Sequence, residues 1–193
     1  MKILTTLQQT LEKFYGAHTG LNVTEFIRVG EMVPRSGQLV VVQNPEETDL
    51  DVAVLLDRDI LAAWQANPQN LTHRHLTVPL EEISHFVYLC FNHNRKRNIT
   101  SLEMELQSEV DRIVLAFHGE LSLSQSQQNS VLEELLDKPY SEERYETARK
   151  AAAKWILGLS GGDPRAWTPE EFAKLRKFFH SDLAEKLFLS GGS

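Results

Sequence analysis

Cysteine is almost absent from this 193-residue chain, which contains only Cys90. One cysteine excludes an internal disulfide, and the apolar neighbours Phe86, Leu89 and Phe91 predict a buried small side chain rather than a reactive thiol. Long hydrophobic runs are also absent. No stretch approaches the roughly 20 apolar residues that span a bilayer, and the N-terminal segment lacks the apolar core of a signal peptide. We therefore expect a cytoplasmic protein without membrane association.

The motifs that usually identify an enzyme are missing as well. The chain has no GxxxxGK[ST] phosphate loop, no GxSxG nucleophile elbow, no dinucleotide fingerprint and no His-Glu-x-x-His zinc motif. Without a complete catalytic set, the sequence favours a protein that is not an enzyme and that needs no cofactor. The leading expectation is an interaction or regulatory protein that binds a protein partner or forms a homo-oligomer.

Basic residues are fewer than acidic residues, and the formal net charge is −7. Because an acidic surface repels phosphates, we do not expect nucleic acid to be a partner. Hydrophobic residues make up 41% of the chain and charged residues 24%, which is typical of a globular domain. The length fits one domain, or one domain with a helical extension.

The apolar pattern predicts an α+β fold, with an N-terminal helix, a small three-stranded antiparallel sheet and then a predominantly helical bundle. Leucines and Phe14 recur at helical spacing over residues 3–17. Three runs rich in Val, Ile and Leu predict strands at 25–29, 38–43 and 51–56. A turn at 34–37 and a polar loop at 44–49 join them, so we expect a meander, with the third run as its most buried strand.

Helical patterns fill the rest of the chain. Capping residues, prolines and glycines place helices at about 57–67, 79–94, 100–118, 122–138, 141–158 and 168–189, with capping boxes expected at Thr100–Glu103 and Thr168–Glu171. The glycine-rich loop 159–167 is the best internal hinge. It suggests a core domain over 1–158 with a loop and C-terminal helix over 159–193, or a single domain over 1–193.

Candidate chemistry gathers on the two helices predicted at 79–94 and 100–118. Glu82 and His85 form a Glu-x-x-His pair, whose side chains meet on one helix face. Two such pairs with two further glutamates bind metal in di-iron bundles, but this chain has one pair. Glu105 and Glu109 on the second helix are candidates for the missing carboxylates. Alternatively, Glu109 pairs with Arg112 and the whole set is structural.

These residues support an alternative function, a hydrolase that uses a divalent metal ion. Its candidate catalytic residues are His85, Glu109 and Arg112, and its candidate metal ligands are Glu82, His85, Glu105 and Glu109.

A second alternative is nucleic-acid binding through the basic C-terminal helices. The candidate anion or nucleic-acid contacts are Arg95, Arg97, Arg149, Lys150 and Lys177. Acidic residues are interleaved with them, and the same pattern also describes the solvent-facing side of amphipathic helices.

Overall fold

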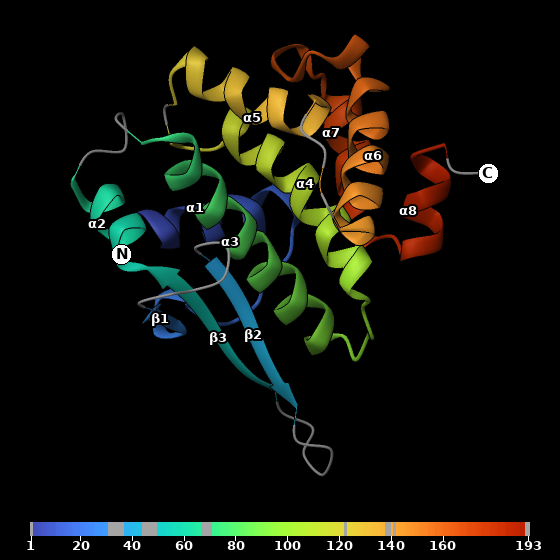
Figure 1. Cartoon of the computed structure of the whole chain (residues 1–193). Coiled ribbons are helices and arrows are strands. Elements are labelled where there is room, and N and C mark those ends of the chain that lie inside the picture. Colours follow the sequence, from blue (N-terminus) through green and yellow to red (C-terminus); the bar gives the residue numbers. More distant parts are fainter. Residues whose placement is uncertain are drawn as a thin grey trace.

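The computed structural model describes residues 2–30, 37–43, 50–66, 71–121, 123–137, 140 and 142–191. Most of them are helical, and a three-stranded sheet lies at one end of the molecule (Figure 1). The loop predicted at 44–49 lies outside the described residues, as does the turn predicted at 34–37 except for Gly37.

The elements follow one another in the order that the apolar pattern predicts. The α-helices are α1 (Lys2–Tyr15), α2 (Arg58–Ala66), α3 (His73–Asn94), α4 (Ser101–His118), α5 (Gln125–Asp137), α6 (Glu143–Leu157), α7 (Pro169–His180) and α8 (Leu183–Leu189). The strands are β1 (Ile27–Gly30), β2 (Gly37–Gln43) and β3 (Leu50–Asp57). Three short 3₁₀ helices are η1 (Val23–Glu25), η4 (Ser160–Gly162) and η5 (Pro164–Ala166).

The sheet is mixed, so the prediction of a purely antiparallel meander is wrong. Its strand order is β1-β3-β2, with β1 parallel and β2 antiparallel to β3. The six residues between β1 and β2 are enough to span the roughly 10 Å that separate strands two positions apart. The burial of the side chains agrees with β3 as the central strand. Val54 and Leu56 of β3 are fully buried, whereas Val41 and Val42 of β2 are exposed. The third run is therefore central, as predicted.

Helix α3 begins six residues before the predicted start at Pro79, which lies inside the helix. Thr72 is the N-cap and accepts a hydrogen bond from the backbone N–H of His75. A proline inside a helix leaves the carbonyl four residues earlier without its usual donor. Here that carbonyl belongs to His75, and it accepts a hydrogen bond from the indole N–H of Trp64 on α2. A tertiary contact therefore compensates for the proline, and the first two turns of α3 can form.

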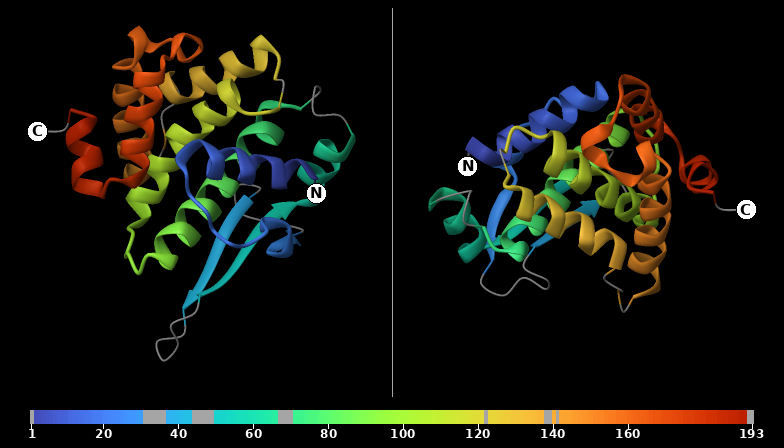
Figure 2. Two further views of the ribbon diagram at one scale, coloured as in Figure 1. Left: turned by 180° about the vertical axis from the view of Figure 1, so that it is seen from behind. Right: turned by 90° about the horizontal axis from the view of Figure 1, so that it is seen from above.

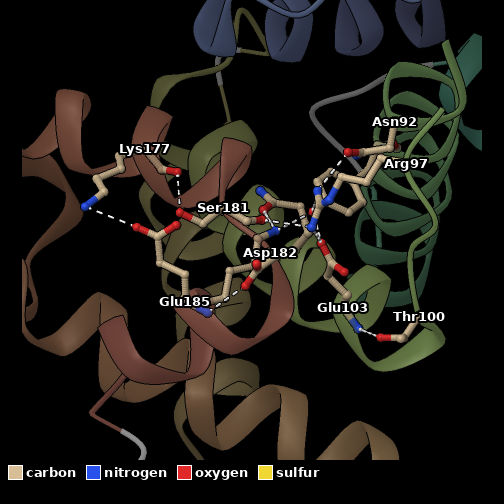
Figure 3. Close-up of polar contacts among 11 residues, drawn as sticks. Asn92, Arg97, Thr100, Glu103, Lys177, Ser181, Asp182 and Glu185 are labelled. Carbon is tan, nitrogen blue, oxygen red and sulfur yellow. Dashed lines mark hydrogen bonds and ion pairs between the residues drawn. The ribbon is translucent and has the colours of Figure 1, made fainter. Parts of the chain in front are cut away.

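The segment predicted as one helix over 168–189 is two helices. The predicted capping box at Thr168 and Glu171 is present, but α7 ends at His180 and α8 starts at Leu183. Asp182 caps α8 by accepting a hydrogen bond from the N–H of Glu185. Arg97 donates to the carbonyl of Ser181, 3.2 Å away, and so ties this break to the end of α3 (Figure 3).

Helix α3 connects the two halves of the molecule. One side of α3 packs on β2 and β3, and other sides contact α1 and α4, while α6 packs on α4 (Figures 1 and 2). A continuous set of buried side chains runs from Leu4 and Val54 to Phe178 and Phe179, so the C-terminal helices share the core of the N-terminal part. Among the described residues, no helix has the length and apolar character needed to span a membrane.

Candidate functional site

A cavity of about 830 Å³ opens between the sheet and the helices. One wall is the start of β2, the floor is formed by α3 and α4, and the far side is formed by α5, residue 140 and the start of α6. The lining contains six glutamates and three arginines, so it is strongly charged. The charged lining residues are Arg74, Glu81, Glu82, Glu105, Glu109, Arg112, Glu134, Glu142 and Arg144, with His73 and His85.

Three of the lining residues form a compact set of possible metal ligands. Glu81 and His85 lie one helical turn apart on α3, so their side chains share a face. Glu105 reaches the same point from the first half of α4, which packs on α3. One ligand atom from each of the three lies within 4.8 Å of the others. Such spacing allows all three side chains to bind one ion.

Two polar atoms beside this cluster are buried without a hydrogen-bond partner among the described residues. They are Oε2 of Glu82 and Nε2 of His85, and both side chains are more than nine-tenths buried. His85 Nε2 lies 3.3 Å from Glu105 Oε2, and His85 Nδ1 lies 3.8 Å from Glu82 Oε2. These distances are those of ion pairs, but the groups lack hydrogen-bond geometry. Buried polar atoms are usually satisfied, so exceptions facing a cavity point to a missing ligand.

The electrostatics of the cluster favour a positive charge at its centre. Burial raises the pKa of Glu81 to about 7, and the Glu82 and Glu105 carboxylates add to this shift, whereas Arg112 and His85 oppose it. Burial lowers the pKa of His85, but its contacts with Glu105 and Glu82 outweigh burial and raise the pKa well above its usual value. Protons on Glu81 and His85 thus reduce the negative charge of the cluster, and a bound metal ion could reduce it in their place.

A second polar group lines the same cavity. Arg112 forms a close ion pair with Glu109, and its guanidinium lies 3.4 Å from Glu134 and 3.3 Å from the Tyr140 hydroxyl. Glu134 also pairs with His73 at 2.5 Å. The i,i+3 pairing of Glu109 with Arg112 matches the structural alternative for these two residues.

The side of the cavity opposite the sheet carries a cation. Arg144, on the first turn of α6, has a side chain that is 42% exposed and lies 3.9 Å from Glu105 Oε1. The Tyr145 hydroxyl accepts a hydrogen bond from Arg144. This arginine is therefore beside the candidate ligands while its other face remains in solvent.

All the candidate catalytic and metal-binding residues predicted from the sequence line this one cavity. The compact cluster contains His85 and Glu105 from the predicted set, whereas Glu109 is paired with Arg112 and Glu82 lies beside the cluster. Glu81 was not among the predicted ligands. The signal that could have found it is Glu81-Glu82-x-x-His85, which has the spacing of His-Glu-x-x-His with glutamate in the first ligand position.

The predicted anion contacts lie elsewhere, and each has a partner within the chain. Arg97 binds Glu103 and Asn92 (Figure 3), and Arg149 pairs with Glu146 and donates to the carbonyls that end α5. The remaining three are engaged at the surface: Lys150 with Glu146, Lys177 with Glu185, and Arg95 over the ring of Phe91.

A different set of buried polar residues lies in the core, away from the cavity lining. Lys186 of α8 is fully buried and donates to the Tyr88 hydroxyl at 2.9 Å and to Gln107 Oε1 at 2.6 Å. Asp111 of α4 accepts hydrogen bonds from Gln107 and from the hydroxyls of Tyr15 and Ser84, each at 2.6 Å. We refer to these six residues as the core polar network.

Glu103 extends the core polar network towards the surface. Its backbone N–H bonds to Thr100, as the predicted capping box requires, but its carboxylate binds Tyr88 and Arg97 instead of turning back to the cap (Figure 3). Thr100 therefore caps α4 as predicted, but Glu103 does not complete the capping box. Cys90 is buried nearby on α3, as predicted, and burial raises its pKa to about 12.

The chain matches no protein-family model, no curated protein sequence and no solved structure. The evidence for function is therefore the chemistry of the cavity itself.

Proposed function

We propose that this protein is a hydrolase that uses a divalent metal ion bound by Glu81, His85 and Glu105. The observation that carries this proposal is that the ligand atoms of these three residues converge within 4.8 Å of one another in an open cavity. Three protein ligands leave a coordination position for water, which is the arrangement of catalytic rather than structural metal sites.

The donor set limits the identity of the ion. Two carboxylates and one imidazole suit zinc and manganese, whereas magnesium and calcium prefer sites made of oxygen alone. A bound ion would be held in position by Glu81 and His85 on one rigid helix and by Glu105 on the next. It would supply a water of lowered pKa to the cavity.

Glu82 is the candidate general base in this proposal. It follows the first ligand directly, and its buried Oε2 accepts no hydrogen bond among the described residues. A carboxylate beside a metal-bound water can take the proton as the water oxygen attacks a substrate carbonyl, and can then pass this proton to the leaving group. Arg144 on the opposite side can stabilise the negative charge that develops on the carbonyl oxygen.

Metal binding is the first test. We expect protein purified without a metal-affinity tag to retain or take up one equivalent of zinc or manganese, measured by elemental analysis and calorimetry. His85→Ala should weaken binding by about a hundredfold or more, because removing an outer-shell partner of a ligand already costs about 10- to 100-fold. His93→Ala is the matched control, since His93 lies on the same helix but not in the cavity lining.

A protein that binds neither ion, or a His85→Ala variant that binds as tightly as the wild type, would contradict the metal site. The prediction of an interaction or regulatory protein would then become the leading hypothesis, with His85 and its glutamates as a buried structural ion-pair cluster.

A further inference from the structure

Strand β2 is an edge strand that begins inside the cavity. Among the described residues it pairs on one side only, with β3, and no backbone hydrogen bond occupies its other side. Its first three residues, Gly37 to Leu39, line the cavity, and the strand continues outward to the exposed Val41 and Val42. Within the described part of the chain, a row of backbone donors and acceptors without partners therefore leads into the candidate site.

The start of this edge lies against the proposed general base. A Cβ atom on Gly37 would lie 3.0 Å from Glu82 Cγ and 2.4 Å from Val78 Cγ1. The absence of a side chain therefore lets the backbone of β2 approach α3 at the turn that carries Glu82. A chain paired with β2 would pass beside that carboxylate.

The charge of the cavity selects the class of substrate. Six glutamates against three arginines repel phosphodiesters and other anions, even with the +2 charge of one metal ion included. A polypeptide carries no backbone charge, and its amides pair with an edge strand by β-augmentation. Extended peptides with neutral or basic side chains fit both features.

We infer that the substrate is an extended polypeptide that adds a strand to the free edge of β2 and presents one of its amide carbonyls to the metal. This inference rests on the proposed hydrolase function and adds its substrate class. The reaction is hydrolysis: the water oxygen bonds to the carbonyl carbon, the C–N bond breaks, and Glu82 passes the proton to the leaving amine.

The experiment uses the full chain loaded with zinc or manganese and a peptide library prepared from a digested proteome. Products are identified by mass spectrometry, with Glu82→Gln as the control. We expect wild-type cleavage products that the variant does not form. The best-cleaved peptide is then resynthesised with one N-methylated amide at a time. Strand pairing uses every second amide, so alternate positions on one side of the cleaved bond should each lose about tenfold or more in rate.

The possible results separate the inference from the proposed function. Cleavage that tolerates N-methylation at every position would overturn strand pairing. Hydrolysis of 4-nitrophenyl acetate without any peptide cleavage would overturn the peptide substrate and leave the hydrolase standing. A chain with neither metal nor activity would overturn both. A dimer in sedimentation whose β2 amides are protected from hydrogen exchange would assign the edge to a second copy of the chain.

Discussion

The cavity cluster and the core polar network both bury several ionisable side chains, yet they differ in how well these groups are satisfied. In the core polar network Asp111 accepts three hydrogen bonds, and Lys186 donates two. In the cavity, Glu82 and His85 each keep a buried atom without a hydrogen bond. Burial of charge alone therefore does not mark a functional site. Buried polar atoms without hydrogen bonds beside a cavity are better candidates, because a ligand can supply the missing bonds.

The largest expected effect is on catalysis. Glu82→Gln keeps the size of the side chain but removes the group that accepts the proton from water. We expect the rate of hydrolysis to fall by about 10²- to 10⁴-fold, which is the usual contribution of a general base. Metal affinity should stay within a few-fold of wild type, because Glu82 is not one of the three clustered ligands.

The rate is measured on whichever substrate the metal-loaded wild type hydrolyses. Glu133→Gln, on the exposed side of α5, is the matched control and should leave the rate of hydrolysis unchanged. Full activity in Glu82→Gln would show that another group takes the proton.

The next effect is on stability and should separate the two regions. Asp111→Ala leaves Tyr15, Ser84 and Gln107 as buried donors without an acceptor. We expect the free energy of unfolding to fall by about 3–5 kcal/mol, measured by urea denaturation. Glu82→Gln should cost clearly less, because Glu82 Oε2 has no hydrogen bond to lose and the substitution removes only its 3.8 Å ion pair with His85. Equal losses in the two variants would show that the cavity cluster is as structural as the core.

A pH-dependent effect should come from the core polar network. Burial lowers the pKa of Lys186 to about 7, against the opposing effects of Glu103 and Asp111. Between pH 7 and about 10 the unfolded chain therefore holds a proton that the folded chain has released. The contribution of Lys186 to stability should rise with pH in this window, by up to about 1.4 kcal/mol per pH unit, whereas the raised pKa of His85 contributes in the opposite direction. Above it, the raised pKa values of Tyr15 and Tyr88 act in the opposite direction.

Lys186→Met removes this titration, so the rise between pH 7 and 10 should be absent from the variant. Urea denaturation at a series of pH values provides the comparison. The same slope in both proteins would mean that Lys186 keeps its proton in the folded state.

The smallest expected effect concerns the contact between β2 and α3. Gly37→Ala introduces a Cβ that meets Val78 and Glu82, so these side chains must shift. We expect the rate of hydrolysis to fall by up to about tenfold through misplacement of Glu82, with metal affinity unchanged. Val42→Ala, at an exposed position of the same strand, is the matched control. An unchanged rate in Gly37→Ala would show that the close approach has no role in positioning the base.

The sequence predicted those parts of the fold that local signals determine. The cap at Thr100 and the capping box at Thr168 mark helix starts correctly, and the three strands lie within two residues of their predicted positions. The wrong predictions involve tertiary contacts. The early start of α3 is supported by Trp64, which no local pattern indicates, and Arg97 adds a distant contact to the break after α7. Thr72 and Asp182 are local N-cap signals for these two helix starts that the predicted boundaries did not use.

The candidate site, too, could be predicted only in part from local sequence patterns. The Glu-x-x-His spacing predicted Glu82 and His85 as ligands, and the next helix offered Glu105; the structure brings His85 and Glu105 together with Glu81. Glu81 lies four residues before His85 but was not among the predicted ligands, because the pair was assigned to Glu82 and His85. No sequence pattern predicted the core polar network, because Lys186 is 98 residues from its partner Tyr88.

The position of Lys186 near the end of the sequence has a consequence for synthesis. The Tyr88 hydroxyl and the Gln107 side chain are buried between elements that leave the ribosome early, but their donor is translated much later. Until residue 186 emerges, these two groups stay without that donor. The nascent chain therefore cannot reach its final core one helix at a time, and completion of that core is delayed until α8 is available.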